Sequence, residues 1–443
     1  MTDALFWHRL QFAFTAVYHY LFPQLTMGLA LFIVLFKARP RDEAWAAASR
    51  FWVRIFGLNF AVGVVTGIPM EFQFGTNWAG FSAYAGQVVG HTLGMEGLFA
   101  FFLESTFIAV LVYGEGRVSE GAHRAAAVAL WVGSWLSGYF IIATNAFLQH
   151  PLGFSVGADG RLRLADFGAF VLNPWARAEY AHTIVASVVT ASFVVSAAGA
   201  YYLLRRVHEG PARAFLKLGV PVGFASCVLV AFPTGDRQAK LVARHQPIAL
   251  AAMEGRFESG AMAGINLIGQ PNVRERKLDN PIAVPGILSF LAYGTFQGDV
   301  RGLSEFPEDL WPDNIELAYY SFHIMAGLGT LLGLVMFVAL LASLSGRLFG
   351  TRLLLWMLML AFPFPYIANT AGWLTTELGR QPWLIYGLLR TSQGASPLVH
   401  SGTALFTLIG FCGLYLLLGV AFLAQLAREI EHGPSGEAGG HHG

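Results

Sequence analysis

The sequence predicts an all-α integral membrane protein with about nine transmembrane helices. Of its 443 residues, 55% are hydrophobic and 12% are charged, and the mean hydropathy is +0.54. This composition is typical of membrane chains rather than soluble ones. Nine apolar stretches have a length near the 20 residues that cross a bilayer as a helix. They cover about residues 10–36, 51–70, 90–113, 125–148, 180–204, 215–232, 317–344, 353–374 and 400–424.

The nine stretches occupy one membrane domain over residues 1–443. The first stretch is too long for the core of a signal peptide and is followed by Lys37, Arg39 and Arg41, so it is predicted to remain as the first span. The sequence has no polybasic tract, which argues against a nucleic-acid partner. The glycine-rich residues 433–443, with His441 and His442, are expected to be a disordered tail rather than a metal site.

The distribution of basic residues predicts the orientation, because short loops rich in Lys and Arg stay in the cytoplasm. Basic residues follow spans one, three, five, seven and nine, whereas the opposite short loops hold few and residues 71–89 hold none. The N-terminus is therefore predicted outside and the C-terminus in the cytoplasm. One outer connection, residues 233–312, is much longer than the rest. Long loops in compact proteins are usually functional or disordered, and QPIALAAMEGRFESG within this loop is expected to contain a short helix.

The third span carries two carboxylates, Glu96 and Glu104, and no Lys or Arg. A charge near the middle of a bilayer costs at least a few kcal/mol, so such residues usually face a bundle interior, a water path or a cofactor. A span over 90–113 places Glu96 in the outer part of the membrane and Glu104 about 12 Å deeper. Eight residues rotate an α-helix by about 80° net, so the two carboxylates are expected on neighbouring faces.

Other polar residues fall at the outer half of their spans. These are His19 in span one, His182 in span five, Met325 in span seven and Glu377 after span eight. Imidazole and thioether are axial ligands of low-spin haem. Each of these side chains could equally be a hydrogen-bonded or packed core residue. Residue types and depth alone leave open a haem protein, a proton-coupled transporter with a Glu/His relay, and a haem b anchor that only transfers electrons.

Short motifs along the whole chain resemble subunit I of the cytochrome bd quinol oxidases. They include RLQFAFTAVYHYLF around His19, GIPMEFQFGTNW at 67–78, MEGLFAFFLEST at 95–106, NPWARAEYAHT before His182, FHIM ending at Met325, and GWLTTELGRQPW at 372–383. The resemblance implies a terminal respiratory oxidase of the bacterial inner membrane. It would oxidise a ubiquinol or menaquinol outside and reduce O2 to water with protons from the cytoplasm, so that it is electrogenic without pumping.

The resemblance also implies the cofactors and their ligands. His182 and Met325 would hold a low-spin haem b. His19 and Glu377 would hold two high-spin haems, one haem b and one haem d, or a second high-spin haem b in place of haem d. Arg380 would bind haem propionates, and Trp373 would serve packing. Glu96 and Glu104 would border the high-spin site and carry protons.

The outer loop 233–312 resembles the quinol-binding loop of the family, in its short form. Glu254 in AAMEG matches the loop carboxylate that takes a quinol proton, and the chain is also similar to the cyanide-insensitive branch. Two positions depart from the family: Ala249 stands where many relatives have Lys, and His323 where relatives often have Arg. Arg244, His245 or Arg256 are expected to replace the missing Lys. The implied partners are subunit II of the oxidase and a small single-span subunit.

Overall fold

The computed structural model describes residues 4–39 and 42–434, apart from the side chains of residues 100 and 101. Within this part of the chain, nine helical spans are long and apolar enough to cross a membrane, as predicted. Five are single helices: α1 (Ala4–Lys37), α2 (Glu43–Thr76), α5 (Glu120–Gln149), α12 (Ile315–Leu344) and α16 (Ser401–His432). Arg41 and residues 435–443 of the expected tail lie outside the described residues.

The other four spans are built from consecutive helices. The third consists of α3 (Ala79–Leu98), the π-helix η1 (Phe99–Glu104) and α4 (Ser105–Tyr113). The fifth joins α6 (Phe167–Val171) to α7 (Pro174–Arg205). The sixth joins α8 (Glu209–Leu229), the π-helix η2 (Val230–Gly235) and α9 (Asp236–His245). The eighth joins α13 (Arg352–Leu360) to α14 (Pro363–Gly379), where Pro363 begins the new helix.

Polar side chains cap the starts of several spans. The side-chain oxygens of Asp42, Ser119, Asn173 and Asn314 accept hydrogen bonds from backbone N–H groups in the first turns of α2, α5, α7 and α12. Such caps satisfy N–H groups that have no partner within the helix. In α7, Pro174 follows the cap at the first helical position, where its missing N–H costs nothing. These local signals fix where the spans carrying His182 and Met325 begin.

Small residues allow the helices to pack closely, as is common in membrane bundles. A Cβ added to Gly28 of α1 would lie 2.6 Å from the Cβ of Ala191 in α7. An aromatic cluster joins α2, α7 and α8: the Phe51 ring stacks on Phe215 with centroids 5.6 Å apart and lies 6.1 Å from Tyr202, and Trp52 lies 5.3 Å from Phe215. These buried rings form part of the largest apolar core.

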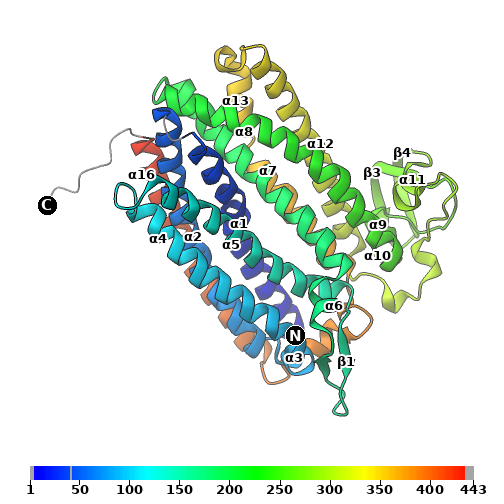
Figure 1. Cartoon of the computed structure of the whole chain (residues 1–443). Helices are drawn as coiled ribbons and strands as arrows, with labels where there is room; N and C mark the ends of the chain where they lie inside the picture. Colours follow the sequence, from blue (N-terminus) through cyan, green and yellow to red (C-terminus); the bar gives the residue numbers. More distant parts are fainter. Residues whose placement is uncertain (1–3, 40–41, 435–443) are drawn as a thin grey trace.

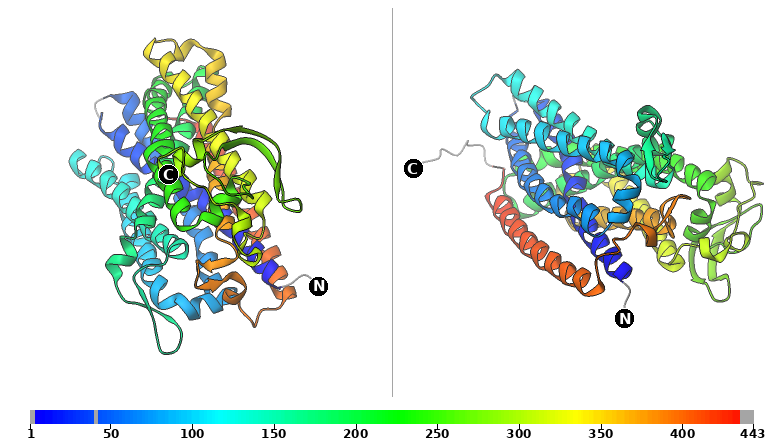
Figure 2. Two further views of the ribbon diagram at one scale, coloured as in Figure 1. Left: turned by 90° about the vertical axis from the view of Figure 1, so that its right-hand side faces the viewer. Right: turned by 90° about the horizontal axis from the view of Figure 1, so that it is seen from below.

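The bundle has two distinct ends (Figures 1 and 2). One end carries the start of α1, the hairpin β1 (Phe154–Val156) and β2 (Leu162–Leu164), and the long connection between α9 and α12. That connection contains α10 (Pro247–Met253), the antiparallel hairpin β3 (Ile265–Asn272) and β4 (Lys277–Val284), α11 (Ile287–Tyr293), and the 3-10 turns η3 (Leu303–Glu305) and η4 (Glu308–Leu310). The same end holds β5 (Trp383–Ile385), β6 (Leu389–Arg390) and α15 (Thr391–Gly394). The last residues of α16 lie at the opposite end, where η5 (Leu348–Gly350) precedes α13.

One predicted boundary is wrong. Residues 71–89 are not an outer loop, because α2 continues to Thr76 and α3 begins at Ala79, leaving only Asn77 and Trp78 between them. The sixth span is kinked at Phe232, whose φ of −105° and ψ of 162° are not helical, and α9 follows this kink up to His245. Small and aromatic residues without charge lengthen the third span. The predicted short helix in the loop is confirmed as α10.

Candidate functional site: buried carboxylates, histidines and the outer loop

Glu96 and Glu104 lie on a helix that contains a π turn between them. Glu96 is the middle residue of the 35-residue span from Ala79 to Tyr113, not in its outer part, because the helix begins earlier than predicted. Glu104 ends the π-helix η1. A π turn bonds residue i to i+5 and so takes up one extra residue. The eight residues from Glu96 to Glu104 therefore turn the helix about as far as seven α-helical residues would. This rotation is roughly 700°, close to two full turns. The predicted offset of about 80° is therefore wrong, and the two carboxylates share nearly one face.

Both carboxylates have polar neighbours from adjacent helices. The Glu104 side chain is buried, and the hydroxyl of Ser134 in α5 donates a hydrogen bond to it. Glu96 interacts electrostatically with Glu104 and also with Glu71 near the end of α2. Glu71 was missed in the sequence because it fell within the range assigned to an outer loop. Three carboxylates therefore interact in series across two helices.

His19 lies on α1 against the C-terminal half of α2. Its Nδ1 lies 3.2 Å from the Thr66 hydroxyl oxygen, and a Cβ added to Gly67 would lie 2.9 Å from the ring carbon Cε1. The glycine therefore provides space for the imidazole between the helices. A hydrogen bond at one ring nitrogen fixes the orientation of a histidine and leaves the other nitrogen for a metal.

His182 and Met325 have comparable surroundings. His182 Nδ1 lies 3.4 Å from the Thr234 hydroxyl oxygen in the π-helix η2, and Gly235 follows beside the same ring. Met325 lies on α12 against α14, where a Cβ added to Gly372 would lie 2.8 Å from its Sδ. Each predicted axial ligand thus lies beside a glycine of a neighbouring segment. Trp373 follows Gly372 and lies one helical turn before Glu377 on α14.

Glu377, whose side chain is 38% exposed, belongs to a polar cluster at the end of α14. The Asn145 amide in α5 donates a 2.8 Å hydrogen bond to Glu377 Oε1, and Arg380 forms an ion pair with Oε2. Glu179 in α7 interacts electrostatically with Glu377 and Arg380. Only 3% of Arg380 and 5% of Glu179 are exposed, yet Nε and Nη1 of Arg380 have no hydrogen-bond partner within the described residues. Glu179 was missed because it lies before the predicted start of span five.

Glu254 lies where the outer loop meets α12. Its carboxylate is 1% exposed, and the Asn266 side-chain amide donates a 2.8 Å hydrogen bond to its backbone oxygen. The backbone N–H of Asn266 lies 3.4 Å from Glu254 Oε2. Burial raises the pKa of Glu254 to about 7, although the Asn266 N–H and the positive charge of Arg256 oppose this rise. A carboxyl group with this pKa can take up or release a proton near neutral pH.

His323 connects the loop to α12 at the same place. Its Nε2 lies 2.7 Å from the Asn266 carbonyl oxygen, and its Nδ1 lies 2.8 Å from the Tyr319 carbonyl oxygen. The His323 ring also stacks on the Tyr319 ring, with centroids 3.9 Å apart. His323 is thus part of the contact between the loop and the bundle, two residues before Met325.

The other predicted loop residues have different surroundings. Arg256 donates hydrogen bonds to the carbonyl oxygens of Val300 and Gly260 and lies close enough to Glu254 to act on its charge. Arg244 is exposed on α9, and His245 packs against His150 with ring centroids 4.2 Å apart. Ala249 is buried against Gly379, where an added Cβ would lie 3.2 Å from the Ala249 Cβ. Gly379 therefore allows α10 and α14 to approach closely at Ala249.

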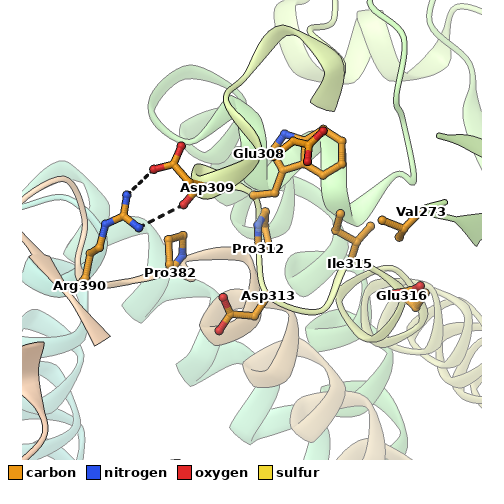
Figure 3. A pocket seen from close by; sticks show the side chains of 10 residues that line it. Val273, Glu308, Asp309, Pro312, Asp313, Ile315, Glu316, Pro382 and Arg390 are labelled. Atoms are coloured by element: carbon orange, nitrogen blue, oxygen red, sulfur yellow. Dashed lines mark hydrogen bonds and ion pairs between the residues drawn. The ribbon is translucent and has the colours of Figure 1, made fainter. Parts of the chain in front are cut away.

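A cavity of about 440 Å³ lies between the last part of the long loop and the segment after α14. Figure 3 shows its acidic lining, with Asp309 paired to Arg390 at 2.7 Å. Nearby, Arg9 of α1 pairs with Asp313 at 2.6 Å. None of the predicted haem ligands or quinol residues lines this cavity. The two ion pairs tie the end of the loop to β6 and to α1.

The chain as a whole matches one protein family. A model described as cytochrome bd terminal oxidase subunit I covers residues 7–434. The chain belongs to this family. It is 34% identical over 440 residues to cytochrome bd ubiquinol oxidase subunit 1 of Bacillus subtilis (strain 168), covering 96% of this chain and 93% of the relative. It is 32% identical over 509 aligned residues to cytochrome bd-II ubiquinol oxidase subunit 1 of Escherichia coli (strain K12), covering 98% of each.

The fold agrees with this family. The bd oxidase structure from Geobacillus thermodenitrificans superimposes with a TM-score of 0.91 at 30% sequence identity, covering 97% of this chain and 99% of the other. As a cytochrome bd subunit I, the chain is a multi-pass protein of the bacterial inner membrane and a subunit of a terminal quinol oxidase. The family implies a partner subunit of the oxidase.

Cytochrome bd oxidases contain haem, and the residues of this subunit I fit haem. Imidazole, thioether and carboxylate side chains supply iron ligands. His19 and His182 are each oriented through Nδ1 by a threonine hydroxyl. The guanidinium of Arg380 has buried donors without protein partners, and carboxylates such as haem propionates are groups that an arginine fork binds well. The donor set and the unpartnered donors therefore suit a large anionic cofactor.

Proposed function

We propose that this cytochrome bd subunit I oxidises a membrane quinol at its outer face and passes the electrons to O2. Two quinols give four electrons and four protons, and one O2 takes up four electrons and four protons to form two waters. The observation that carries the proposal is the buried Glu254 carboxyl, with its pKa near 7, held between the outer loop and the helix of Met325. When bound, the haems supply the electron transfer and the iron at which O2 is reduced.

The proposed ligands are residues of this chain at defined places. His182 and Met325 hold a low-spin haem b, while His19 and Glu377 hold the two high-spin haems, one haem b and one haem d or a second haem b. Arg380 binds propionates, and Trp373 packs in the same layer. The glycines beside His19, His182 and Met325 support this assignment, because a side chain at each of these glycines would crowd the ligand.

Protons move separately on the two sides of the membrane in this proposal. On the outer side, the Glu254 carboxylate accepts a proton from the quinol hydroxyl and later releases it outside. On the inner side, Glu104 takes a proton that has entered from the cytoplasm and passes it toward Glu96. The near alignment of these two carboxylates on one helix face supports the transfer. Opposite release and uptake make the reaction electrogenic without a pump.

Difference spectroscopy and oxygen consumption test the proposal together. The oxidase is purified with its partner subunit, and a small single-span subunit is sought in the same preparation. The expected result is a reduced-minus-oxidised spectrum with a low-spin haem b, a high-spin haem b and either a far-red haem d band or further high-spin haem b. Quinol-driven oxygen consumption should accompany it, with ubiquinol and menaquinol compared. A preparation without haem bands, or with low-spin haem b alone, contradicts the proposal.

A further inference from the structure

Tyr319 is a buried side chain beside Glu254 that the mechanism above does not use. It is the fifth residue of α12 and only 1% of it is exposed. Its hydroxyl has no hydrogen-bond partner within the described residues. A phenol buried this deeply usually hydrogen-bonds through its O–H. The Tyr319 hydroxyl is therefore a donor available to a molecule other than this chain.

The position of the Tyr319 ring is determined on two sides. One face stacks on His323, with centroids 3.9 Å apart and an interplanar angle of 29°. The ring also packs on Gly255, where an added Cβ would lie 3.0 Å from Cδ2 and 3.2 Å from Cε2 of the tyrosine. Gly255 directly follows Glu254 and has a φ of +59°, which a residue with a side chain rarely adopts. These contacts hold the phenol next to the loop carboxylate.

The Tyr319 hydroxyl and the Glu254 carboxylate can therefore act on one small polar group. Glu254 interacts electrostatically with Tyr319. Both side chains are buried, so their hydrogen bonds with a bound group would face little competition from water. One is an acceptor when ionised and the other is a neutral donor. A hydroxyl attached to an aromatic ring offers both a proton for the carboxylate and a lone pair for the phenol.

We propose that the Tyr319 hydroxyl donates a hydrogen bond to the quinol oxygen whose proton Glu254 removes. The inference rests on the proposed function and names a further residue of its quinol site. As the O–H bond of the quinol breaks and the proton moves to Glu254, negative charge grows on the quinol oxygen. The Tyr319 O–H stabilises that charge and keeps its own proton. Preorganised donors aimed at developing charge are an effective source of rate acceleration.

Tyr319→Phe in the purified oxidase complex tests this role, because it removes only the hydroxyl. Tyr320→Phe is the matched control, since Tyr320 is the next residue on α12 and is 43% exposed. The substrate is a short-chain quinol, and dithionite serves as a reductant that does not need the quinol site. Tyr319→Phe should lower kcat/KM for the quinol about tenfold, with normal haem spectra and normal reduction by dithionite. Tyr320→Phe should behave as the unmodified enzyme.

Three results would overturn the role of Tyr319. Equal kcat/KM in the two variants would show that the hydroxyl does not contact quinol. Loss of haem bands together with activity in Tyr319→Phe would assign the residue to the structure alone. An equal slowing of dithionite-driven and quinol-driven haem reduction would do the same. Glu254→Gln separates the two proposals: if it oxidises quinol normally, the proposed quinol site itself fails, whereas its inactivity beside a normal Tyr319→Phe removes only the inference.

Discussion

His323 Nε2 lies 2.7 Å from the carbonyl oxygen of Asn266, and this contact joins helix α12 to strand β3 of the outer loop. The side-chain amide of Asn266 in turn donates a hydrogen bond to the backbone oxygen of Glu254. A single residue of the loop thus connects the proposed proton acceptor with the helix that carries Met325. The loop is held at its other end by the ion pairs Arg9–Asp313 and Arg390–Asp309.

His323→Leu should loosen this connection. The substitution removes the ring that lies within hydrogen-bond distance of the Tyr319 and Asn266 carbonyl oxygens, and loss of the one hydrogen bond that a neutral imidazole donates costs about 1 kcal/mol. Faster limited proteolysis within residues 255–300 and a raised KM for quinol are expected, with Glu254 still present. His400→Leu, at an exposed position on the same side, is the control. Unchanged proteolysis and KM in His323→Leu would show that the contact does not hold the loop.

If His182 and Met325 are the ligands of the low-spin haem b, replacing either residue should remove this haem only. His182→Ala or Met325→Leu should remove the low-spin haem b signal and leave the high-spin haems and the assembled complex, because only one iron loses its ligand. Met336→Leu is the control, since Met336 lies on the same helix as Met325 and is fully buried in an apolar cluster. Visible difference spectra of the purified variants measure this. Retention of the low-spin signal in both ligand variants would refute the assignment.

The two carboxylates of the third span should differ in their effects. Glu104→Ala should slow oxygen reduction about 10²-fold, the lower end of what a positioned proton-transfer group contributes, with all haems retained. Glu96→Ala should slow it and also change the high-spin haem spectra. Glu115→Ala is the control, because Glu115 is exposed just beyond the same span. Oxygen consumption and proton uptake in vesicles are the measurements, and normal rates in both variants would exclude this path.

The number and composition of the membrane spans could be predicted from the sequence, because apolar length directly reports the ability to cross a bilayer. The start of α3 at Ala79 could not be predicted in this way. Residues 79–89 include glycine and polar side chains that lower the hydropathy without breaking the helix. The π turns at Phe99–Glu104 and Val230–Gly235 leave no regular periodicity in the sequence, so the relative direction of Glu96 and Glu104 was missed.

The candidate site was predictable for residues whose type alone is unusual in a membrane, such as Glu104 and His182. Glu71 and Glu179 were missed because they fell outside the predicted spans, and the surroundings of Glu179 and Tyr319 depend on residues that are distant in the sequence. Glu179, for example, interacts with Glu377 and Arg380, about 200 positions away. The replacement of the family's lysine by Ala249 was visible in the sequence, but its close contact with Gly379 was not.

The pH dependence of quinol oxidation should follow the ionisation of Glu254. The carboxylate is the active form, because it must accept the quinol proton. Its pKa of about 7 is raised by burial, so the rate should be low below pH 6 and rise through pH 7 as the group loses its proton. Glu254→Gln should lose this rise. A rate that rises in the same way in Glu254→Gln would assign the titration to another group.

The electron-donor dependence of Glu254→Gln tests the central claim most directly. The purified complex is assayed for oxygen consumption with a short-chain quinol and, separately, with an artificial one-electron donor that requires no deprotonation by the loop. Quinol-driven turnover is predicted to fall at least 10²-fold, while turnover with the artificial donor and the haem spectra stay normal. Equal turnover of Glu254→Gln and the unmodified enzyme with quinol would contradict the account.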